Sequence, residues 1–160
     1  MPAFFLYILL RIRYDKSMER EHTFAYGDII MDEKRLSTRI AHCGLVCAFC
    51  SMGAACDCHT SNFCPKQHSS EGCYQFTCST EKGLRGCWEC DDAPCDKDMH
   101  VHVKIRAFIR CIKEEGLEKF CQYLSINEKN GIVYHREGYS GDYDLPTEEE
   151  VLALLRKHSV

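Results

Sequence analysis

The sequence predicts a small, irregular, α-rich domain of short helices and loops, α+β at most, followed by a helical C-terminal segment. Three observations support this fold class. Thirteen of the 160 residues are cysteine, and eleven of them lie between Cys43 and Cys95. That window holds only nine large apolar side chains, too few to offset an ordering cost of about 1–2 kcal/mol per backbone residue. Helical periodicity appears only after the window. Cross-links or bound metal must therefore stabilise the middle of the chain.

Composition also limits the compartment and the partners. The number of cysteines is odd, so a fully paired disulfide framework cannot use them all. The net charge is -4, with a sequence pI of about 6.1, so the chain has no global basic field to attract nucleic acid or an anionic membrane. We therefore expect a cytoplasmic, thiol-rich protein with neither nucleic acid nor a membrane as its partner.

Cysteine density divides the chain into three parts. Residues 1–30 form an N-terminal extension whose apolar run, residues 3–10, is far shorter than the roughly 20 residues of a membrane helix. An interfacial anchor, a segment buried against the domain and a misassigned start remain open, and we favour a natural start at Met31. Residues 31–98 form the predicted cysteine-rich metal-binding domain. Residues 99–160 form a helical segment packed on it.

Spacing in the C-terminal segment predicts three helices. Apolar side chains recur at helical intervals in two runs, Ile105, Phe108, Ile109 and Ile112, then Leu117, Phe120, Cys121 and Leu124. Gly116 lies between the runs and ends the first helix. Thr147 and Glu150 have the spacing of a capping box, before a last helix with Val151, Leu152, Leu154 and Leu155 on its apolar face. The single strand candidate is Gly131–Tyr134.

The first cysteine cluster has the spacing C-x3-C-x2-C and consists of Cys43, Cys47 and Cys50. Three thiolates this close in sequence can converge on one zinc ion or on an iron–sulfur cluster. The fourth zinc ligand would come from Cys56, Cys58, His59 or Cys64. With Phe49 before the third cysteine, the motif also resembles the cluster loop of radical S-adenosylmethionine enzymes. The alternating strands and helices of that family are not predicted after this loop.

The second cluster contains five thiols, one more than a four-coordinate zinc site needs. Its members are Cys73, Cys78, Cys87, Cys90 and Cys95. The Cys87-x2-Cys90 pair is typical of a tight turn that presents both sulfurs to one ion. A thioredoxin-like redox pair is the alternative, but it needs a βαβ context that the sequence does not predict. Spacing does not indicate which of the five thiols is spare.

Histidines near the clusters are weaker candidates. His42 and His59 adjoin cysteines, and each is either a substitute ligand or a solvated loop residue. His100 and His102 precede the long helix, and we expect them at the surface. The two cysteines outside the window are expected to pack in the helices, Cys121 as a small buried apolar side chain, together with Cys111.

The cysteine pattern resembles a small prokaryotic family, domain of unknown function 3795. The resemblance covers about residues 40–98. It starts with the family's CGLxCxxC opening at residues 43–50 and continues with Cys73, Cys78, Glu81-Lys82-Gly83, Cys87, Cys90 and Pro94-Cys95. The sequence departs from the family between these parts, where it has Cys56, Cys58 and Cys64, and Ser69-Ser70 in place of an expected cysteine. The resemblance implies cysteine-coordinated metal, zinc in particular, and no established activity.

Together these observations predict a small metal-binding protein whose zinc is structural. The predicted ligands are Cys43, Cys47, Cys50, Cys73, Cys78, Cys87, Cys90 and Cys95, with Cys56, Cys58 and Cys64 as contenders. A binding or regulatory role with a protein partner is expected, and no catalytic residue is identified. The alternative is an iron–sulfur redox or radical-type enzyme module that uses the first cluster.

Overall fold

A computed structural model describes residues 33–50, 59–61, 70–136 and 138–159. The described residues are helix-rich and contain no sheet, which confirms the α-rich prediction. The α-helices are α1 (Glu33–Ser37), α2 (Tyr74–Glu81), α3 (Val103–Glu115), α4 (Leu117–Lys129) and α5 (Glu148–Arg156), with 3-10 turns η2 (Cys47–Phe49), η4 (Cys87–Glu89) and η5 (Asp98–Val101). Two isolated bridges, Ile40–Val46 and Arg136–Tyr139, are the β pairing of the described part.

The three C-terminal helices form where periodicity predicts them. Gly116 separates α3 from α4 with a φ of 90°, a conformation that glycine adopts at low cost. The capping box is confirmed, because the Glu150 N–H donates to Thr147 Oγ1 over 3.2 Å and the Thr147 N–H donates to the Glu150 carboxylate over 3.1 Å. The strand prediction for Gly131–Tyr134 is wrong, since these residues have no neighbouring strand and Tyr134 instead enters the core.

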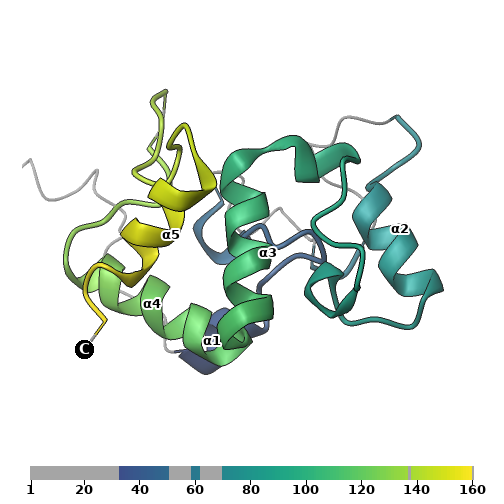
Figure 1. Ribbon diagram of the computed structural model, residues 1–160, viewed down its shortest axis with the longest axis horizontal. Coiled ribbons are helices and arrows are strands. Elements are labelled where there is room, and N and C mark those ends of the chain that lie inside the picture. Colours follow the sequence, from purple (N-terminus) through teal and green to yellow (C-terminus); the bar gives the residue numbers. More distant parts are fainter. Residues whose placement is uncertain (1–32, 51–58, 62–69, 137, 160) are drawn as a thin grey trace, which may run out of the picture.

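One apolar core joins α3, α4 and α5 to α1 and to the loop that carries the first cysteine cluster (Figure 1). Phe108 lies at its centre, with its ring centroid 5.1 Å from that of Phe120 and 5.6 Å from that of Tyr143. From the loop, Leu45 and Val46 are buried in the same cluster. The first cysteine cluster is therefore part of the helical core rather than a separate unit.

Ion pairs fasten α5 across α3. Arg106 and Arg110 both donate to the carboxylate of Glu148, over 2.7 and 2.9 Å. Burial alone would raise the pKa of Glu148, but hydrogen bonds from the two guanidinium groups hold it below its usual value. At the other end of α5, Arg156 pairs with Glu115 over 2.7 Å. Ion pairs at both ends of α5 thus hold this helix against α3.

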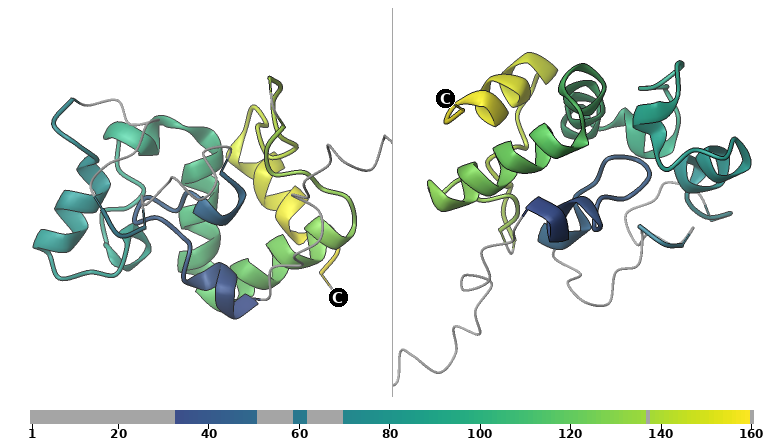
Figure 2. Two further views of the ribbon diagram at one scale, coloured as in Figure 1. Left: turned by 180° about the vertical axis from the view of Figure 1, so that it is seen from behind. Right: turned by 90° about the horizontal axis from the view of Figure 1, so that it is seen from below.

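The segment from residue 70 to residue 98 lies at the other end of the molecule, with α2 farthest from α5 (Figures 1 and 2). None of its described residues belongs to the core cluster, and only Trp88 packs against that cluster while half-buried. An eight-residue helix such as α2 is marginal without tertiary support. Its support must come from polar contacts and from the cysteines. Residues 1–30 lie outside the described residues, and no described helix is both long and apolar enough to cross a bilayer.

Candidate metal centre

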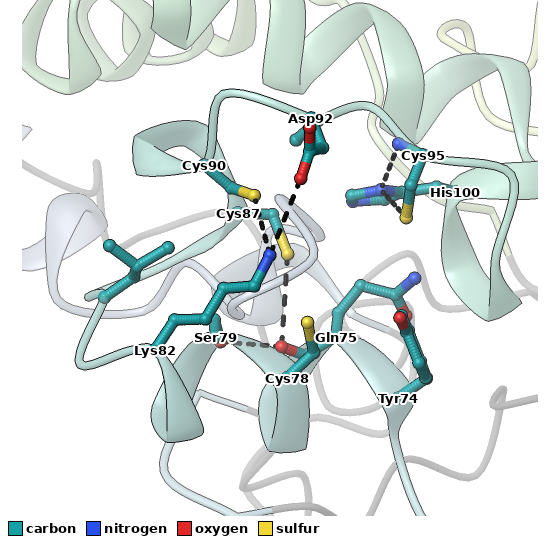
Figure 3. A pocket seen from close by; sticks show the side chains of 12 residues that line it. Tyr74, Gln75, Cys78, Ser79, Lys82, Cys87, Cys90, Asp92, Cys95 and His100 are labelled. Atoms are coloured by element: carbon teal, nitrogen blue, oxygen red, sulfur yellow. Dashed lines mark hydrogen bonds and ion pairs between the residues drawn. The ribbon is translucent and has the colours of Figure 1, made fainter.

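Four of the predicted ligands line one cavity of about 90 Å³. Cys78 reaches it from α2, Cys87 and Cys90 from η4 and its C-cap, and Cys95 from the following loop. Figure 3 shows their sulfur atoms turned toward the cavity, with His100 beside Cys95. The fifth thiol of the second cluster, Cys73, is buried at the N-cap of α2 and is not among the lining residues. The fold thus shows which four of the five thiols lie together, which spacing alone did not indicate.

Hydrogen-bond donors of α2 face two of these sulfurs. Lys82 Nζ donates to Cys90 Sγ over 3.5 Å and lies 3.7 Å from the carboxylate of Asp92. The hydrogen bond to Cys90, and the charges of the neighbouring thiols and of Asp92, raise the pKa of Lys82. Tyr74, two turns earlier on α2, directs its hydroxyl to Cys78, and that hydrogen bond raises the pKa of Tyr74. Donors placed in this way stabilise thiolates, the form in which cysteine binds metal.

The other two sulfurs of the cavity have buried partners. Cys87 Sγ lies 4.0 Å from the carbonyl oxygen of Gln75. Burial, followed by the charges of the surrounding thiols, raises the pKa of Cys87 to about 12. Cys95 Sγ lies 3.4 Å from Nδ1 of His100. Without a cation, Cys87 therefore keeps its proton near neutral pH, and a bound metal must displace it.

His100 corrects the expectation that it lies at the surface. Its side chain is 0% exposed, because the segment before α3 folds back under α2, whereas His102 is exposed as expected. Burial lowers the pKa of His100 to about 4, so the ring is neutral at pH 7. A neutral imidazole has a lone pair that can bind a metal. Sequence spacing did not single out this residue.

Two basic side chains of α3 hold the backbone of the cavity loop. Lys113 donates to the carbonyl oxygens of Cys90, Asp91 and Ala93 over 2.7–3.3 Å. Arg106 donates to those of Cys95 and His100 over 3.2 and 3.4 Å. Because Lys113 and Arg106 are seven residues apart, they lie on one face of the helix. The C-terminal segment therefore positions the loop that carries three of the thiols.

Polar contacts attach α2 to the rest of the molecule. The Gln75 amide donates to the carbonyl oxygen of Lys97 over 2.6 Å and accepts from the N–H of Met99 over 3.2 Å. Ser79 Oγ lies 2.6 Å from Nδ1 of His42, next to the first cysteine cluster. His42 therefore contacts a serine and is neither of the two alternatives left open for it, a metal ligand or a solvated loop residue.

The first cluster is buried in the core beside Tyr134 and does not line the cavity of the second cluster. Cys43, Cys47 and Cys50 are each at most 3% exposed. Burial raises the pKa of Tyr134 well above its usual value, and the charges of all three thiols raise this pKa further. The N–H of Val46 donates to the Tyr134 hydroxyl over 3.1 Å and has the opposite effect. All three thiols therefore lie within electrostatic range of one phenol. The contenders Cys56, Cys58 and Cys64 lie outside the described residues.

Among the described residues, no three histidine, cysteine, aspartate or glutamate side chains meet at one point as metal ligands. The donors of the second cluster line a common cavity, and a metal would require their side chains to close on it. Two observations fit such an ion. The donor set is rich in sulfur, and the buried Nε2 atom of His100 has no hydrogen-bond partner in the described structure. Metal ligands that are histidines use their second nitrogen for an outer contact.

The two remaining cysteines behave as predicted. Cys111 and Cys121 are 0% exposed on α3 and α4, and burial raises the pKa of both thiols to about 12. They are packing residues of the core and lie outside the cavity.

Comparisons with family models, with curated proteins and with solved structures found no match to this chain. The resemblance to domain of unknown function 3795 therefore stays a prediction, and the geometry of the two cysteine clusters is what indicates a function.

Proposed function

We propose that this chain is a zinc-binding protein in which the ion is structural and holds the segment from residue 70 to His100 against the helical core. The observation that carries the proposal is the single cavity lined by four thiols and one buried imidazole. Sulfur and imidazole are the ligands that zinc prefers in structural sites.

The energetics of the segment support a structural ion. Between residues 70 and 98 the buried side chains are Cys73, Gln75, Ser79 and Cys87, none of which is a large hydrocarbon, in contrast to the core around Phe108, to which Met99 already belongs. Burial of apolar area contributes about 25 cal/mol per Å², and this segment has little such area to bury. A bound zinc ion supplies folding free energy directly, because the assembled site does not exist in the unfolded chain.

Charge around the cavity supports the same proposal. Zinc bound to three or four thiolates leaves a net negative site. Lys82 faces the sulfurs, and Lys113 binds the carbonyl oxygens of the same loop. Positive groups at these places offset the excess charge of the ligands, as outer partners of a metal site do.

We extend the proposal to a second site at Cys43, Cys47 and Cys50. Their burial beside Tyr134 supports a shared ion or cluster there. The fourth ligand would come from the segment between Cys50 and residue 64. An iron–sulfur cluster at this site, in a redox or radical-type enzyme, is the alternative, because three buried thiols in an apolar setting suit either group.

The biological role that we propose is binding or regulation in the cytoplasm through a protein partner, without a reaction of its own. Exposed apolar side chains that a partner would cover include Val101, which is 55% exposed, and Tyr139, which is 79% exposed. Neither nucleic acid nor a membrane is part of the proposal, because the acidic net charge disfavours both.

Elemental analysis of protein purified without oxygen tests the proposal. We expect a colourless protein that carries zinc, with less zinc in the Cys87→Ser and Cys90→Ser variants. Cys121→Ser is the matched control, since it removes a buried thiol that lies outside both clusters. Brown protein with iron and an absorption band near about 400 nm would establish the iron–sulfur alternative. Protein free of both metals would overturn both.

A further inference from the structure

The cavity is lined by a buried imidazole as well as by thiols. His100 lies in η5, between the cysteine-bearing loop and α3, and its ring is fully buried. Nδ1 accepts a hydrogen bond from the N–H of Cys95 over 3.3 Å and lies 3.4 Å from the sulfur of the same residue. Figure 3 shows the ring and the thiol side by side at one edge of the cavity.

The distance between these two atoms matches one edge of a zinc tetrahedron. Zinc–sulfur bonds of about 2.3 Å and zinc–nitrogen bonds of about 2.0–2.1 Å at a tetrahedral angle separate sulfur and nitrogen by about 3.5 Å. The Cys95 Sγ and His100 Nδ1 atoms lie 3.4 Å apart. One ion can thus bind both atoms without a change in their separation, and it would replace the hydrogen bond from the N–H of Cys95, because Nδ1 has a single lone pair.

The second nitrogen of the ring is free to make an outer contact when Nδ1 binds a metal. Nε2 is buried and has no hydrogen-bond partner within the described structure. The backbone of Cys43, in the first cluster, lies close enough to the ring to favour its protonated form. With Nδ1 bound to metal, the Nε2–H group would be directed to that backbone. A histidine in this position would link the second site to the loop of the first site.

The order of the donors along the sequence also favours His100 as a ligand. Cys87, Cys90, Cys95 and His100 follow one another as C-x2-C-x4-C-x4-H within one continuous segment. Cys78, by contrast, comes from α2 and shares a face of that helix with Tyr74 and Lys82, which direct their donors to the sulfurs. Helix α2 thus supplies side chains that hydrogen-bond to the sulfurs, and the loop supplies four possible metal ligands that are close together in sequence.

We propose that His100 is the fourth zinc ligand of the second site, through Nδ1, together with Cys87, Cys90 and Cys95. Cys78 and Cys73 then lie outside the first coordination shell. This inference rests on the proposed zinc function and deepens it, because it replaces an all-cysteine site by one with three sulfurs and one nitrogen.

Cadmium-113 NMR of the full-length protein, with the zinc exchanged for cadmium-113 and the histidines labelled with nitrogen-15, tests the ligand set. We expect the cadmium resonance that is lost in Cys87→Ser to show scalar coupling to a single imidazole nitrogen. The coupling should disappear in His100→Asn and persist in His102→Asn, which alters an exposed histidine two residues away. Cys78→Ser should keep both the resonance and the coupling.

The wild-type measurement keeps the inference falsifiable even if His100→Asn fails to fold. No coupling to an imidazole nitrogen at the cadmium resonance of the second cluster would overturn it, as would loss of a cadmium–sulfur contact in Cys78→Ser. Wild-type protein that binds no zinc or cadmium would instead overturn the proposed function itself. In a folded His100→Asn variant, zinc affinity should fall at least about 100-fold, since even outer-shell changes cost 10–100-fold.

Discussion

Lys82 Nζ donates a hydrogen bond to the sulfur of Cys90 over 3.5 Å, at the mouth of a cavity lined by three further thiols. The same ammonium lies 3.7 Å from Asp92, so the lysine is placed between a carboxylate and the sulfurs (Figure 3). A cation in this position offsets the negative charge of a metal-loaded site.

Replacing Lys82 by methionine should therefore weaken zinc binding by about 10-fold, the lower end of the range for outer-shell partners, because the lysine is partly exposed. Competition with a zinc-chelating dye measures the affinity. Lys129→Met removes an exposed lysine at the end of α4 and serves as the control. Equal affinities of the two variants would contradict a role for Lys82 at the site.

Metal removal should act on one end of the molecule. Cys43, Cys47 and Cys50 are buried in the helical core, so loss of metal should affect their loop less than the segment from residue 70 to residue 98. Hydrogen exchange should become fast between residues 70 and 98 and stay slow in α3 and α4. Exchange in residues 70–98 that does not change after verified removal of metal would contradict a structural ion.

Lowering the pH should release the metal before the core unfolds. The ligands must lose protons to bind zinc, and the pKa of Cys87 is raised to about 12 by burial and by its neighbours, so protons compete for this thiol over the whole acidic and neutral range. We expect zinc affinity to fall steadily as the pH decreases from 8 to 5. Equilibrium dialysis at several pH values measures it, and an affinity independent of pH would argue against thiolate ligands.

The contact between α3 and α5 predicts a second, distinct pH dependence. The folded-state pKa of Glu148 is depressed, so its contribution to stability is present above the unfolded value of about 4.5 and is lost as the pH falls through the folded value. Glu148→Gln should cost about 1–2 kcal/mol at pH 7 and much less at pH 3. Urea unfolding at both pH values measures the difference. Glu149→Gln, at an exposed neighbour, is the control, and an equal loss in both variants would contradict the assignment.

Substitution of Gly44 by alanine tests how tightly the first cysteine loop packs on α3. Its φ is 93°, and an added Cβ would lie 2.9 Å from Cδ1 of Ile109. Gly131 has a similar φ of 80° but no atom within 4 Å of an added Cβ. Alanine at Gly131 should cost about 1–2 kcal/mol from backbone strain alone, and alanine at Gly44 should cost about 1–3 kcal/mol more. Thermal unfolding measures both, and a partial rescue of Gly44→Ala by Ile109→Val would confirm the steric cause.

The sequence alone determined the elements whose causes are local. The spacing of Ile105, Phe108, Ile109 and Ile112 defines the buried face of α3, and Thr147 with Glu150 defines the start of α5, because periodicity and capping depend on residues within one or two turns. Cysteine density likewise identified residues 43–95 as a window that has few large apolar side chains and needs cross-links or metal.

Only the tertiary structure decided how those segments are used. It placed the first cluster inside the helical core, left Cys73 off the cavity, and brought Lys82 and His100 to the thiols. The strand expected at Gly131–Tyr134 failed for a related reason, since a strand needs a partner and Tyr134 packs instead on Phe108 and bonds to the loop at Val46. Such outcomes depend on contacts between residues far apart in sequence, which the spacing of residues along the chain does not encode.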